Sequence, residues 1–370
     1  MHPEVIDVRA PGDPSGAVER AGRLLSSGRV VVLATETVYG VAASASAPGA
    51  LDELWRIKGP GRRAPLAWHL HSSIALTEAL SSGSIVLTPL QRRAIRVLTP
   101  GPVTFAIGAS GEQLASIRAK AGVSTGVFDD GSELLVRVPD RRVTREVIER
   151  AGVPVVIGSL GGVRLAQSAQ DAAEMADGAA LILDDGPPTY EARSTLIRLG
   201  PEGGYEVARE GALPGRIIRR RMARTLLFVC TGNTCRSPMA AAIARHLLAA
   251  GGSSGIETRV KSAGTSAGFG MEATPEGVEA LRDIGIEMGR HSSAPLTREM
   301  LNEAEVVFGM TRSHVESILR LDPGVRDRVF LLDPSGADIA DPIGSPRRVY
   351  DEVASLLRRA IEQRLKELPE

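Results

Sequence analysis

Cys230 and Arg236 are separated by five residues in the stretch Leu226-Leu-Phe-Val-Cys-Thr-Gly-Asn-Thr-Cys-Arg-Ser-Pro238. The apolar residues 226–229 predict a short buried strand, and Pro238 predicts that a helix begins after the loop. At such a turn, backbone N–H groups and the positive end of the helix dipole point at one anion. Arg236 adds a planar fork for two phosphate oxygens. The same field stabilises a thiolate, so we expect Cys230 to be an activated nucleophile that Ser237 hydrogen-bonds.

Two other interpretations of this stretch are open. Cys230 could be an inert core thiol at the end of a strand, or Cys230 and Cys235 could bind zinc. The order of strand, loop and helix favours the nucleophile over the inert thiol. Zinc is disfavoured because these are the only two cysteines and no paired histidines stand nearby. We therefore expect no metal at this loop.

Length, charge and cysteine content restrict the class of protein. At 370 residues the chain is long enough for two domains. Its 44 basic and 44 acidic residues cancel, which disfavours a strongly basic polyanion-binding protein. Two cysteines argue against a disulfide scaffold and favour a reducing compartment. The start lacks a signal-peptide pattern and no apolar run of about 18 residues occurs, so we expect a cytoplasmic protein without a membrane partner.

The C-terminal part of the chain alternates predicted strands and helices. The strands are predicted at residues 226–229, 258–262, 306–310 and 329–332, and the helices at about 238–250, 275–284, 313–319 and 347–367. Parallel strands need crossover connections, usually helices. The alternation therefore predicts an α/β domain with a parallel sheet of about four strands and helices on both faces.

A phosphatase that uses a thiolate needs an acid to protonate the leaving group and then a base for the attacking water. One aspartate on a mobile loop can do both. Three Asp-Pro pairs lie in this part of the chain, at Asp322, Asp333 and Asp341. An Asp-Pro pair alone is a weak signal that does not choose among them.

Residues 224–368 resemble the low-molecular-weight protein tyrosine phosphatases in residues 230–238, Ser262-Ala-Gly-Thr265, His291-Ser292 and Asp341-Pro342. The resemblance implies that Cys230 is the nucleophile, Arg236 the phosphate clamp and Asp341 the general acid. It implies a phosphate-binding loop formed by Thr231, Gly232, Asn233, Thr234, Cys235 and Ser237. Asn233 and Ser237 would organise that loop, whereas His291 is expected to be structural.

Thr234 bears on the substrate. Tyrosine-specific members of the family usually carry isoleucine there, and the bacterial protein arginine phosphatases resemble this sequence in carrying threonine. Its hydroxyl could orient the attacked P–N bond, or the residue could be a β-branched spacer. Ile343 follows the acid at a position where an aromatic residue is common.

The resemblance therefore implies a phosphatase that acts through a cysteinyl-phosphate on phosphorylated proteins. Phosphoarginine is the first expected substrate and phosphotyrosine the second. No cofactor is expected for this reaction. An arsenate reductase shares the fold and the nucleophile, but it normally passes oxidising equivalents through further cysteines, and this chain has no third thiol.

The N-terminal part carries polar motifs next to predicted strands. A strand at residues 30–34 leads into Thr35-Glu-Thr-Val-Tyr-Gly40, a helix at about 49–57 precedes Lys58, and strands are predicted at 134–138, 154–159, 194–198 and 205–210. Ligands of α/β sheets usually bind just past strand ends. Over residues 15–214 these segments resemble the threonylcarbamoyl-AMP synthases, which start a tRNA modification. The resemblance implies a YrdC-like twisted mixed sheet with helices.

The same resemblance implies a site for threonine and ATP phosphates, formed by Thr35, Thr37, Tyr39, Lys58, Ser159 and Ser194. Two motif positions depart from the family. The arginine of its Lys-x-Arg pair falls on Pro60, with Arg62 or Arg63 as a replacement, and the asparagine of its Ser-x-Asn pair falls on Gly161. Losing a planar cation and an amide weakens phosphate binding, so we expect impaired or lost synthase chemistry.

Three alternatives for the N-terminal domain stay open. If it is active, ATP and Mg²⁺ are the implied ligands, and the phosphatase domain is accessory to tRNA modification. If it is inactive, it could bind nucleotide or double-stranded RNA and regulate the phosphatase. The simplest alternative is that residues 35–40 are only a packed turn.

The domain boundary is predicted after Pro214-Gly215, where a basic run at residues 216–221 begins. We predict a YrdC-like domain at residues 1–214, a basic linker at 215–222 and the phosphatase domain at 223–370. The basic run is expected to be a solvated linker, with contact to RNA or substrate as the alternative.

Overall fold

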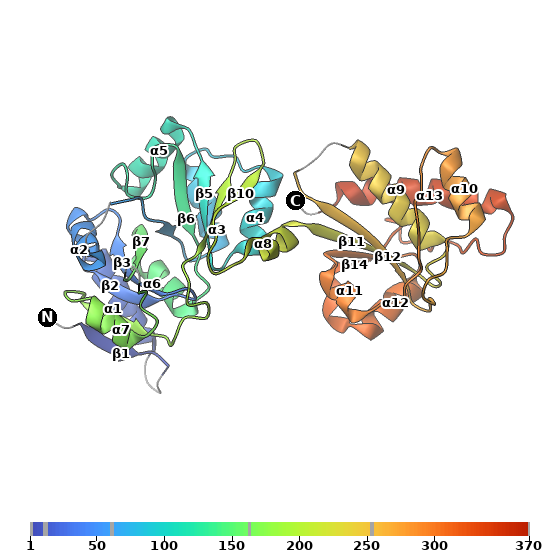
Figure 1. The fold of residues 1–370 in the computed structure, drawn as a ribbon. Helices are drawn as coiled ribbons and strands as arrows, with labels where there is room; N and C mark the ends of the chain where they lie inside the picture. Colours follow the sequence, from blue (N-terminus) through green and yellow to red (C-terminus); the bar gives the residue numbers. More distant parts are fainter. Residues whose placement is uncertain (1–2, 10–13, 60–62, 162–163, 252–254, 369–370) are drawn as a thin grey trace. The chain divides into compact units, whose positions relative to one another are not determined.

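The structure, a computed structural model, describes residues 3–9, 14–59, 63–161, 164–251 and 255–368. It divides the chain into two compact units, Met1–Arg221 and Met222–Glu370. Figure 1 shows the elements of both units. In the described ranges, no helix combines the length and the apolar composition that crossing a membrane requires.

The N-terminal unit contains a mixed sheet of ten strands in the order β1-β8-β2-β3-β7-β4-β6-β5-β9-β10. Its strands are β1 (Glu4–Asp7), β2 (Val31–Ala34), β3 (Tyr39–Ser44), β4 (Trp68–His69), β5 (Val103–Gly108), β6 (Glu133–Arg137), β7 (Val155–Ser159), β8 (Leu181–Asp184), β9 (Thr195–Leu199) and β10 (Tyr205–Arg209). Its helices are α1 (Pro14–Ser26), α2 (Pro48–Lys58), α3 (Ser73–Ser82), α4 (Pro89–Leu98), α5 (Gly111–Ala121), α6 (Arg142–Ala151), α7 (Ala169–Met175) and α8 (Gly215–Met222). The predicted mixed sheet with helices is confirmed.

Strand β2 is buried on both faces and paired along both of its edges. All four of its residues are buried, as expected for an apolar strand covered on both faces. It pairs antiparallel with β3 and parallel with β8. Helices α1 and α6 pack on one face, where Val18, Leu25 and Val147 join Val31 and Leu33 in one core cluster.

The stretch predicted to be a basic linker, residues 215–222, forms helix α8. Ile218 is fully buried, whereas Arg216 and Arg219 are exposed, so the helix has an apolar side and a charged side. Just before the helix, the backbone of Leu213 is hydrogen-bonded in both directions to Thr195 Oγ1, at 2.7 and 3.0 Å. The run of arginines made this helix difficult to predict from the sequence.

The C-terminal unit is built on a four-stranded sheet in the order β12-β11-β13-β14, with every pair parallel. Its strands are β11 (Arg224–Cys230), β12 (Thr258–Gly264), β13 (Val306–Gly309) and β14 (Val329–Leu331). Its helices are α9 (Arg236–Ala250), α10 (Pro275–Asp283), α11 (Arg298–Glu303), α12 (Arg312–Leu321), the 3₁₀ helix η1 (Pro323–Arg328) and α13 (Arg347–Lys366). The predicted parallel sheet of four strands is confirmed.

Successive residues of β11 enter two different cores, because side chains of a strand alternate between the faces of the sheet. Leu226 and Phe228 join the cluster that contains side chains of α9, α10 and α13. Leu227 and Val229 join the cluster with side chains of α11, α12 and η1. Figure 1 shows these two groups of helices on opposite faces of the sheet. Because β11 is buried on both faces, its carboxyl end, where Cys230 lies, is held in place.

Candidate functional site

Cys230 is the last residue of β11, and α9 begins at Arg236, so the predicted phosphate loop connects a central strand to a helix. The helix begins two residues before Pro238, which therefore occupies its third position. Proline is tolerated there because the first N–H groups of a helix have no intrahelical partner. Cys230 itself is buried. The loop thus lies at the carboxyl edge of the sheet, beside the start of α9.

Two hydrogen-bond donors contact the sulfur of Cys230. Ser237 Oγ lies 3.0 Å from Cys230 Sγ, and the backbone N–H of Asn233 donates to the same sulfur at 3.3 Å. Ser237 Oγ also accepts from Asn233 Nδ2 at 2.9 Å. Its own hydrogen is therefore left for the sulfur or for the carbonyl of Ala263, 3.2 Å away. Hydrogen bonds of this kind favour the thiolate over the thiol.

Asn233 organises the loop through its side chain and its backbone. It adopts the left-handed conformation with φ 54°, which costs energy for a residue other than glycine. Its Nδ2 also donates to Ser262 Oγ at 3.0 Å, and its Oδ1 accepts from the N–H of Ala294 at 2.9 Å. His291 Nε2 lies 2.6 Å from its carbonyl oxygen. These contacts hold the strained turn, and His291 contacts the loop backbone.

Arg236 is buried, and two of its three nitrogens have partners. Nη1 donates to the carbonyl of Ile339 at 3.0 Å, and Nη2 is ion-paired with Asp341. Nε is buried without a hydrogen-bond partner among the described residues. A buried donor without a partner is rare in native proteins and calls for an acceptor that binds there. A phosphate oxygen in the loop is such an acceptor.

Asp341 lies on the segment 336–345, called the acid loop below, between β14 and α13. The loop is attached to the sheet edge because the N–H of Ile339 donates to Met310 O at 2.9 Å. The other two Asp-Pro aspartates are engaged in local turns. Asp322 accepts from the N–H of Gly324 at 2.9 Å, and Asp333 accepts from that of Ser335 at 2.9 Å. Of the three, Asp341 contacts the phosphate loop.

Thr234 and Cys235 complete the loop. Thr234 is 8% exposed, its Oγ1 lies 3.7 Å from Cys235 Sγ, and a Cβ on Gly232 would lie 3.4 Å from this Oγ1. Its carbonyl accepts from the N–H of Thr274 at 2.9 Å. Cys235 is buried, with its sulfur 3.9 Å from Tyr350 Oη.

Sequence reasoning missed a histidine whose side chain contacts the loop. His314, at the start of α12, has its Nε2 2.9 Å from Thr231 Oγ1. The signal was present, because Met310-Thr-Arg-Ser-His314 follows strand β13 directly, at the same carboxyl edge as Cys230.

The N-terminal unit has a pocket of about 290 Å³, lined by 21 residues that include Thr35, Thr37, Lys58, Ser159 and Ser194. Five of the six predicted ligand residues therefore lie together. Thr35 and Thr37 bond through their hydroxyls at 2.8 Å, and Lys58 Nζ donates to the carbonyl of Ser159 at 3.1 Å. Ser194 Oγ lies 2.8 Å from Thr104 Oγ1.

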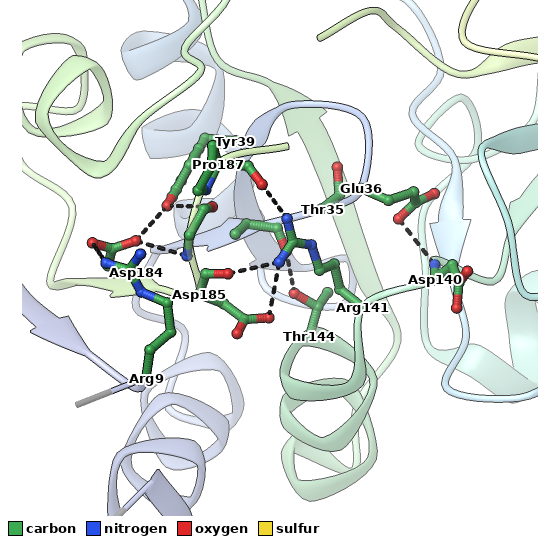
Figure 2. Close-up of polar contacts among 12 residues, drawn as sticks. Arg9, Thr35, Glu36, Tyr39, Asp140, Arg141, Thr144, Asp184, Asp185 and Pro187 are labelled. Atoms are coloured by element: carbon green, nitrogen blue, oxygen red, sulfur yellow. Dashed lines mark hydrogen bonds and ion pairs between the residues drawn. The ribbon is translucent and has the colours of Figure 1, made fainter. Parts of the chain in front are cut away.

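Tyr39, the sixth predicted residue, does not line the pocket. Val38 and Gly40 line it, and the side chain between them lies on the other side. Figure 2 shows the hydroxyl of Tyr39 bonded to Asp184 Oδ1, at 2.8 Å, with the carbonyl of Gly186 at 3.0 Å. Tyr39 thus anchors the start of the segment that connects β8 to β9.

The same segment is bound to the Thr35–Gly40 turn by Glu36. The carbonyl of Glu36 accepts from the N–H groups of Thr189 and Tyr190, at 2.9 and 3.0 Å. Its carboxylate accepts from the N–H of Asp140 at 2.9 Å (Figure 2). The other carboxylate oxygen of Glu36 pairs with Arg137 at 2.6 Å. Because Arg137 lines the pocket, this buried ion pair connects the turn to the pocket wall.

Three arginines that sequence reasoning missed line the pocket with Lys58, namely Arg137, Arg193 and Arg209. No Asp or Glu is among the described residues of the lining. Burial and the nearby charge of Arg193 lower the pKa of Lys58, and burial with Arg193 and Arg137 lowers that of Arg209. Arg137 Nε is buried without a hydrogen-bond partner in the described structure. These features together describe a site for an anion.

The two departures from the family motif have different outcomes. A Cβ on Gly161 would lie 2.0 Å from the carbonyl oxygen of Arg164, and the φ of Gly161 is 86°, so an asparagine does not fit here. Arg63 pairs with Asp52 at 2.8 Å and does not line the pocket. Pro60 and Arg62 lie outside the described residues.

A buried cysteine at the end of a parallel strand, a C-x₅-R loop and a helix that begins at the arginine are the arrangement that a cysteine-dependent phosphatase requires. Residues 225–370 match the family of low molecular weight phosphotyrosine protein phosphatases. Residues 23–211 match the Sua5/YciO/YrdC family, described as "Telomere recombination". The chain belongs to both families, and both predicted resemblances are confirmed. Its C-terminal unit is a phosphatase domain.

Individual proteins resemble the C-terminal unit. A protein-arginine-phosphatase of Bacillus subtilis (strain 168) is 39% identical over 146 residues, which cover 37% of this chain and 95% of that protein. A probable low molecular weight protein-tyrosine-phosphatase, EpsP of Ralstonia nicotianae, is 32% identical over 142 residues. These residues cover 38% of this chain and 93% of that protein. A crystal structure of a YwlE mutant from Bacillus subtilis is 35% identical, covers 40% of this chain and 100% of that chain, and has a TM-score of 0.38.

Proposed function

We propose that the phosphatase domain removes phosphate from arginine residues of proteins. The observation that carries this proposal is Thr234, a buried hydroxyl in the phosphate loop where tyrosine-specific relatives usually carry isoleucine. The 39% identity to a protein-arginine-phosphatase, against 32% to a probable tyrosine phosphatase, supports it. Phosphotyrosine is the alternative substrate.

The reaction proceeds in two steps. The thiolate of Cys230 attacks phosphorus, the P–N bond breaks, and Asp341 gives a proton to the departing guanidino nitrogen. Water then attacks phosphorus, the P–S bond breaks, and Asp341 takes a proton from that water. Phosphate leaves and the thiolate is restored. Each step is a displacement at phosphorus, so the thiol chemistry needs no oxidant.

The charge on the transferred phosphoryl group is held by the loop. Arg236 offers its unpartnered Nε, and the loop N–H groups at the start of α9 add to the positive field. Asp341 pairs with Arg236 Nη2 in this structure, so the acid already lies beside the clamp. When a phosphate dianion binds the guanidinium, Asp341 is released from the ion pair, and its carboxyl group in the protonated form gives the proton to the departing nitrogen.

The substrate preference follows from the walls of the site. Isoleucine in place of Thr234 would offer only apolar contact, which suits a phenyl ring better than a polar guanidinium. Ile343, on the acid loop, is 63% exposed and gives no aromatic face on which a phenol could stack. Both residues therefore favour the guanidinium substrate.

Parallel hydrolysis of a phosphoarginine protein and a phosphotyrosine peptide by the full chain tests this proposal. We expect a higher kcat/KM for phosphoarginine, no turnover with Cys230→Ser, and a ratio moved toward phosphotyrosine by Thr234→Ile. Thr258→Ile, at the start of β12 and so at the edge of the sheet opposite to Cys230, is the matched control. Preference of the parent protein for phosphotyrosine would contradict the proposal.

For the N-terminal unit we propose binding of a small polyanion, with ATP as the probe. Four cations line its pocket, no acid stands in the described lining, and Arg137 Nε lacks a partner. Mg²⁺ would arrive with the nucleotide, because no cluster of three His, Cys, Asp or Glu side chains suited to a metal occurs in the described residues. Apolar Trp55 and Leu66 in the lining suit a nucleoside.

Calorimetric titration of the full chain with ATP tests this second proposal. Lys58→Met and Arg209→Gln should each weaken binding about tenfold, since each removes a charged donor. Arg63→Gln is the control, because Arg63 is exposed and lies outside the lining. Pyrophosphate release that depends on threonine and bicarbonate would favour a synthase. Binding of double-stranded RNA but not ATP would contradict the proposal.

A further inference from the structure

His314 contacts the phosphate loop in one defined tautomer. It occupies the third position of α12 and is buried. Its Nδ1 accepts from the N–H of Thr311 at 3.1 Å, in the capping box of the helix. A neutral imidazole carries one proton, so that proton is on Nε2, which lies 2.9 Å from Thr231 Oγ1. His314 therefore donates, and the hydroxyl of Thr231 accepts.

The charge state of the ring is fixed as well. Burial, and then the charge of Arg236, lower the pKa of His314 to about 4, while Asp341 and Asp338 act in the opposite direction. These three charged groups face the ring from the phosphate loop and the acid loop. At neutral pH the ring is uncharged and keeps its tautomer.

Thr231 is the residue directly after the nucleophile. His314 is the one partner of its hydroxyl in the described part of the chain, and the residue is exposed. With one lone pair used by His314, the hydroxyl keeps its hydrogen for another acceptor. Phosphoryl oxygens in the loop are strong, charged acceptors.

The turn that carries His314 also holds the acid loop. The N–H of Arg312 donates to Asp338 Oδ1 at 2.9 Å, and Met310 O accepts from the N–H of Ile339 at 2.9 Å. The carbonyl of Ile339 in turn accepts from Arg236. Residues 310–314 thus connect the loop of the nucleophile to the loop of the acid.

We propose that His314 is a positioning residue that orients the hydroxyl of Thr231 as a hydrogen-bond donor to the transferred phosphoryl group. The inference rests on the phosphatase function but not on the phosphoamino acid, because the phosphoryl group is common to both substrates. The hydroxyl of Thr231 thus adds a side-chain donor to the backbone N–H donors of the Cys230–Ser237 loop. His314 acts through Thr231 and does not touch substrate.

The test measures inorganic phosphate binding to the full chain by calorimetry and the turnover of p-nitrophenyl phosphate. Thr231→Val and His314→Leu should each weaken phosphate binding roughly tenfold, the value of one hydrogen bond to a charged acceptor. The double variant should be no weaker than either single one, because both remove the same bond. Thr231→Ser and His314→Gln should restore binding, since each keeps a donor at its position.

Thr297→Ala controls for loss of a helix cap, because Thr297 caps α11 as Thr311 caps α12. It should lower thermal stability without changing phosphate binding. Unchanged phosphate binding by Thr231→Val, or additive effects in the double variant, would overturn the proposal. Failure to hydrolyse phosphoarginine would leave these binding results intact, so the two proposals fail separately.

Discussion

The guanidinium of Arg236 is ion-paired with the carboxylate of Asp341, so the phosphate clamp and the expected acid contact each other across two loops. Arg236 is buried, whereas the side chain of Asp341 is 39% exposed. Burial therefore restricts the side chain of Arg236 more than that of Asp341. A phosphate that binds this guanidinium would compete with Asp341 for the same donors.

Asp341→Asn should lower turnover by roughly 10²–10⁴, the usual contribution of a general acid. Phosphate binding should be retained or become tighter, because the amide no longer competes for Arg236 with a full charge. The measurement is kcat with a phosphoarginine protein, together with the inhibition constant of inorganic phosphate.

Asp322→Asn and Asp333→Asn are the matched controls, because both aspartates precede proline and both accept hydrogen bonds in local turns. Each should change kcat by less than about twofold. A loss at either control as large as that at Asp341 would show that the acid has been assigned to the wrong loop.

Asn233 joins backbone strain and hydrogen bonding at one residue, and two substitutions separate these effects. Asn233→Gly removes the side-chain bonds to Ser237, Ser262 and Ala294 but suits φ 54°, whereas Asn233→Ala removes the bonds and keeps the strain. Both should lose at least about tenfold in kcat, because Ser237 is no longer oriented toward the sulfur.

Alanine should destabilise the C-terminal unit by about 1 kcal/mol more than glycine, the cost of the left-handed conformation. Differential scanning calorimetry of the full chain measures this difference. Near-normal turnover of Asn233→Gly would mean that the loop needs only the backbone conformation at this position, and not the amide.

The arrangement of the phosphate loop could be predicted from the sequence because the contacts that form it are local. Cys230, Asn233 and Arg236 belong to one continuous turn, and a strand followed by a helix brings their groups together without help from distant residues. Asp341 needed more, because three Asp-Pro pairs lie in this part of the chain and only the family resemblance chose among them. What separates it from Asp322 is contact with Arg236, which only the folded chain shows.

The pocket of the N-terminal unit was harder to predict, because its cations come from separate strands. Arg137 ends β6, Arg193 precedes β9 and Arg209 ends β10, so the order and register of the sheet bring them together. Tyr39 shows the opposite effect. It stands among pocket residues in sequence, but the alternation of strand side chains turns it to the other face.

The spacing of the two cysteines predicts reversible oxidation. An activated Cys230 is the group most readily oxidised to sulfenic acid, and Cys235 on the same loop could trap it as a disulfide. Peroxide should inactivate the phosphatase and dithiothreitol should restore it. Cys235→Ser should be active when reduced but should not recover after peroxide.

The alternative is that Cys235 only packs beside Tyr350, 3.9 Å from its hydroxyl. Disulfide geometry is strict, so proximity on a loop does not ensure bonding. Thr234→Ser, at the neighbouring position, is a control that keeps both thiols. Equal recovery of Cys235→Ser and the parent protein after peroxide would support the packing role.

His69 should make the N-terminal unit less stable in acid. Its Nδ1 lies 2.8 Å from the carbonyl of Ala67, and burial, followed by the nearby charge of Arg137, lowers its pKa from 6.5 to about 3. Between these pH values the unfolded chain binds a proton that the folded unit does not. Stability is therefore fully present above pH 6.5 and falls as the pH drops toward 3, by at most about 1.4 kcal/mol per pH unit.

Urea unfolding followed by tryptophan fluorescence measures this effect in the full chain, because the only two tryptophans, Trp55 and Trp68, lie in the N-terminal unit. His69→Gln should show a shallower fall in the free energy of unfolding between pH 6.5 and 3.5 than the parent protein. His71→Gln, which removes a less buried imidazole two residues away, is the control and should keep the parent slope. Equal slopes for His69→Gln and the parent protein would mean that protonation of His69 does not limit the stability of this unit in acid.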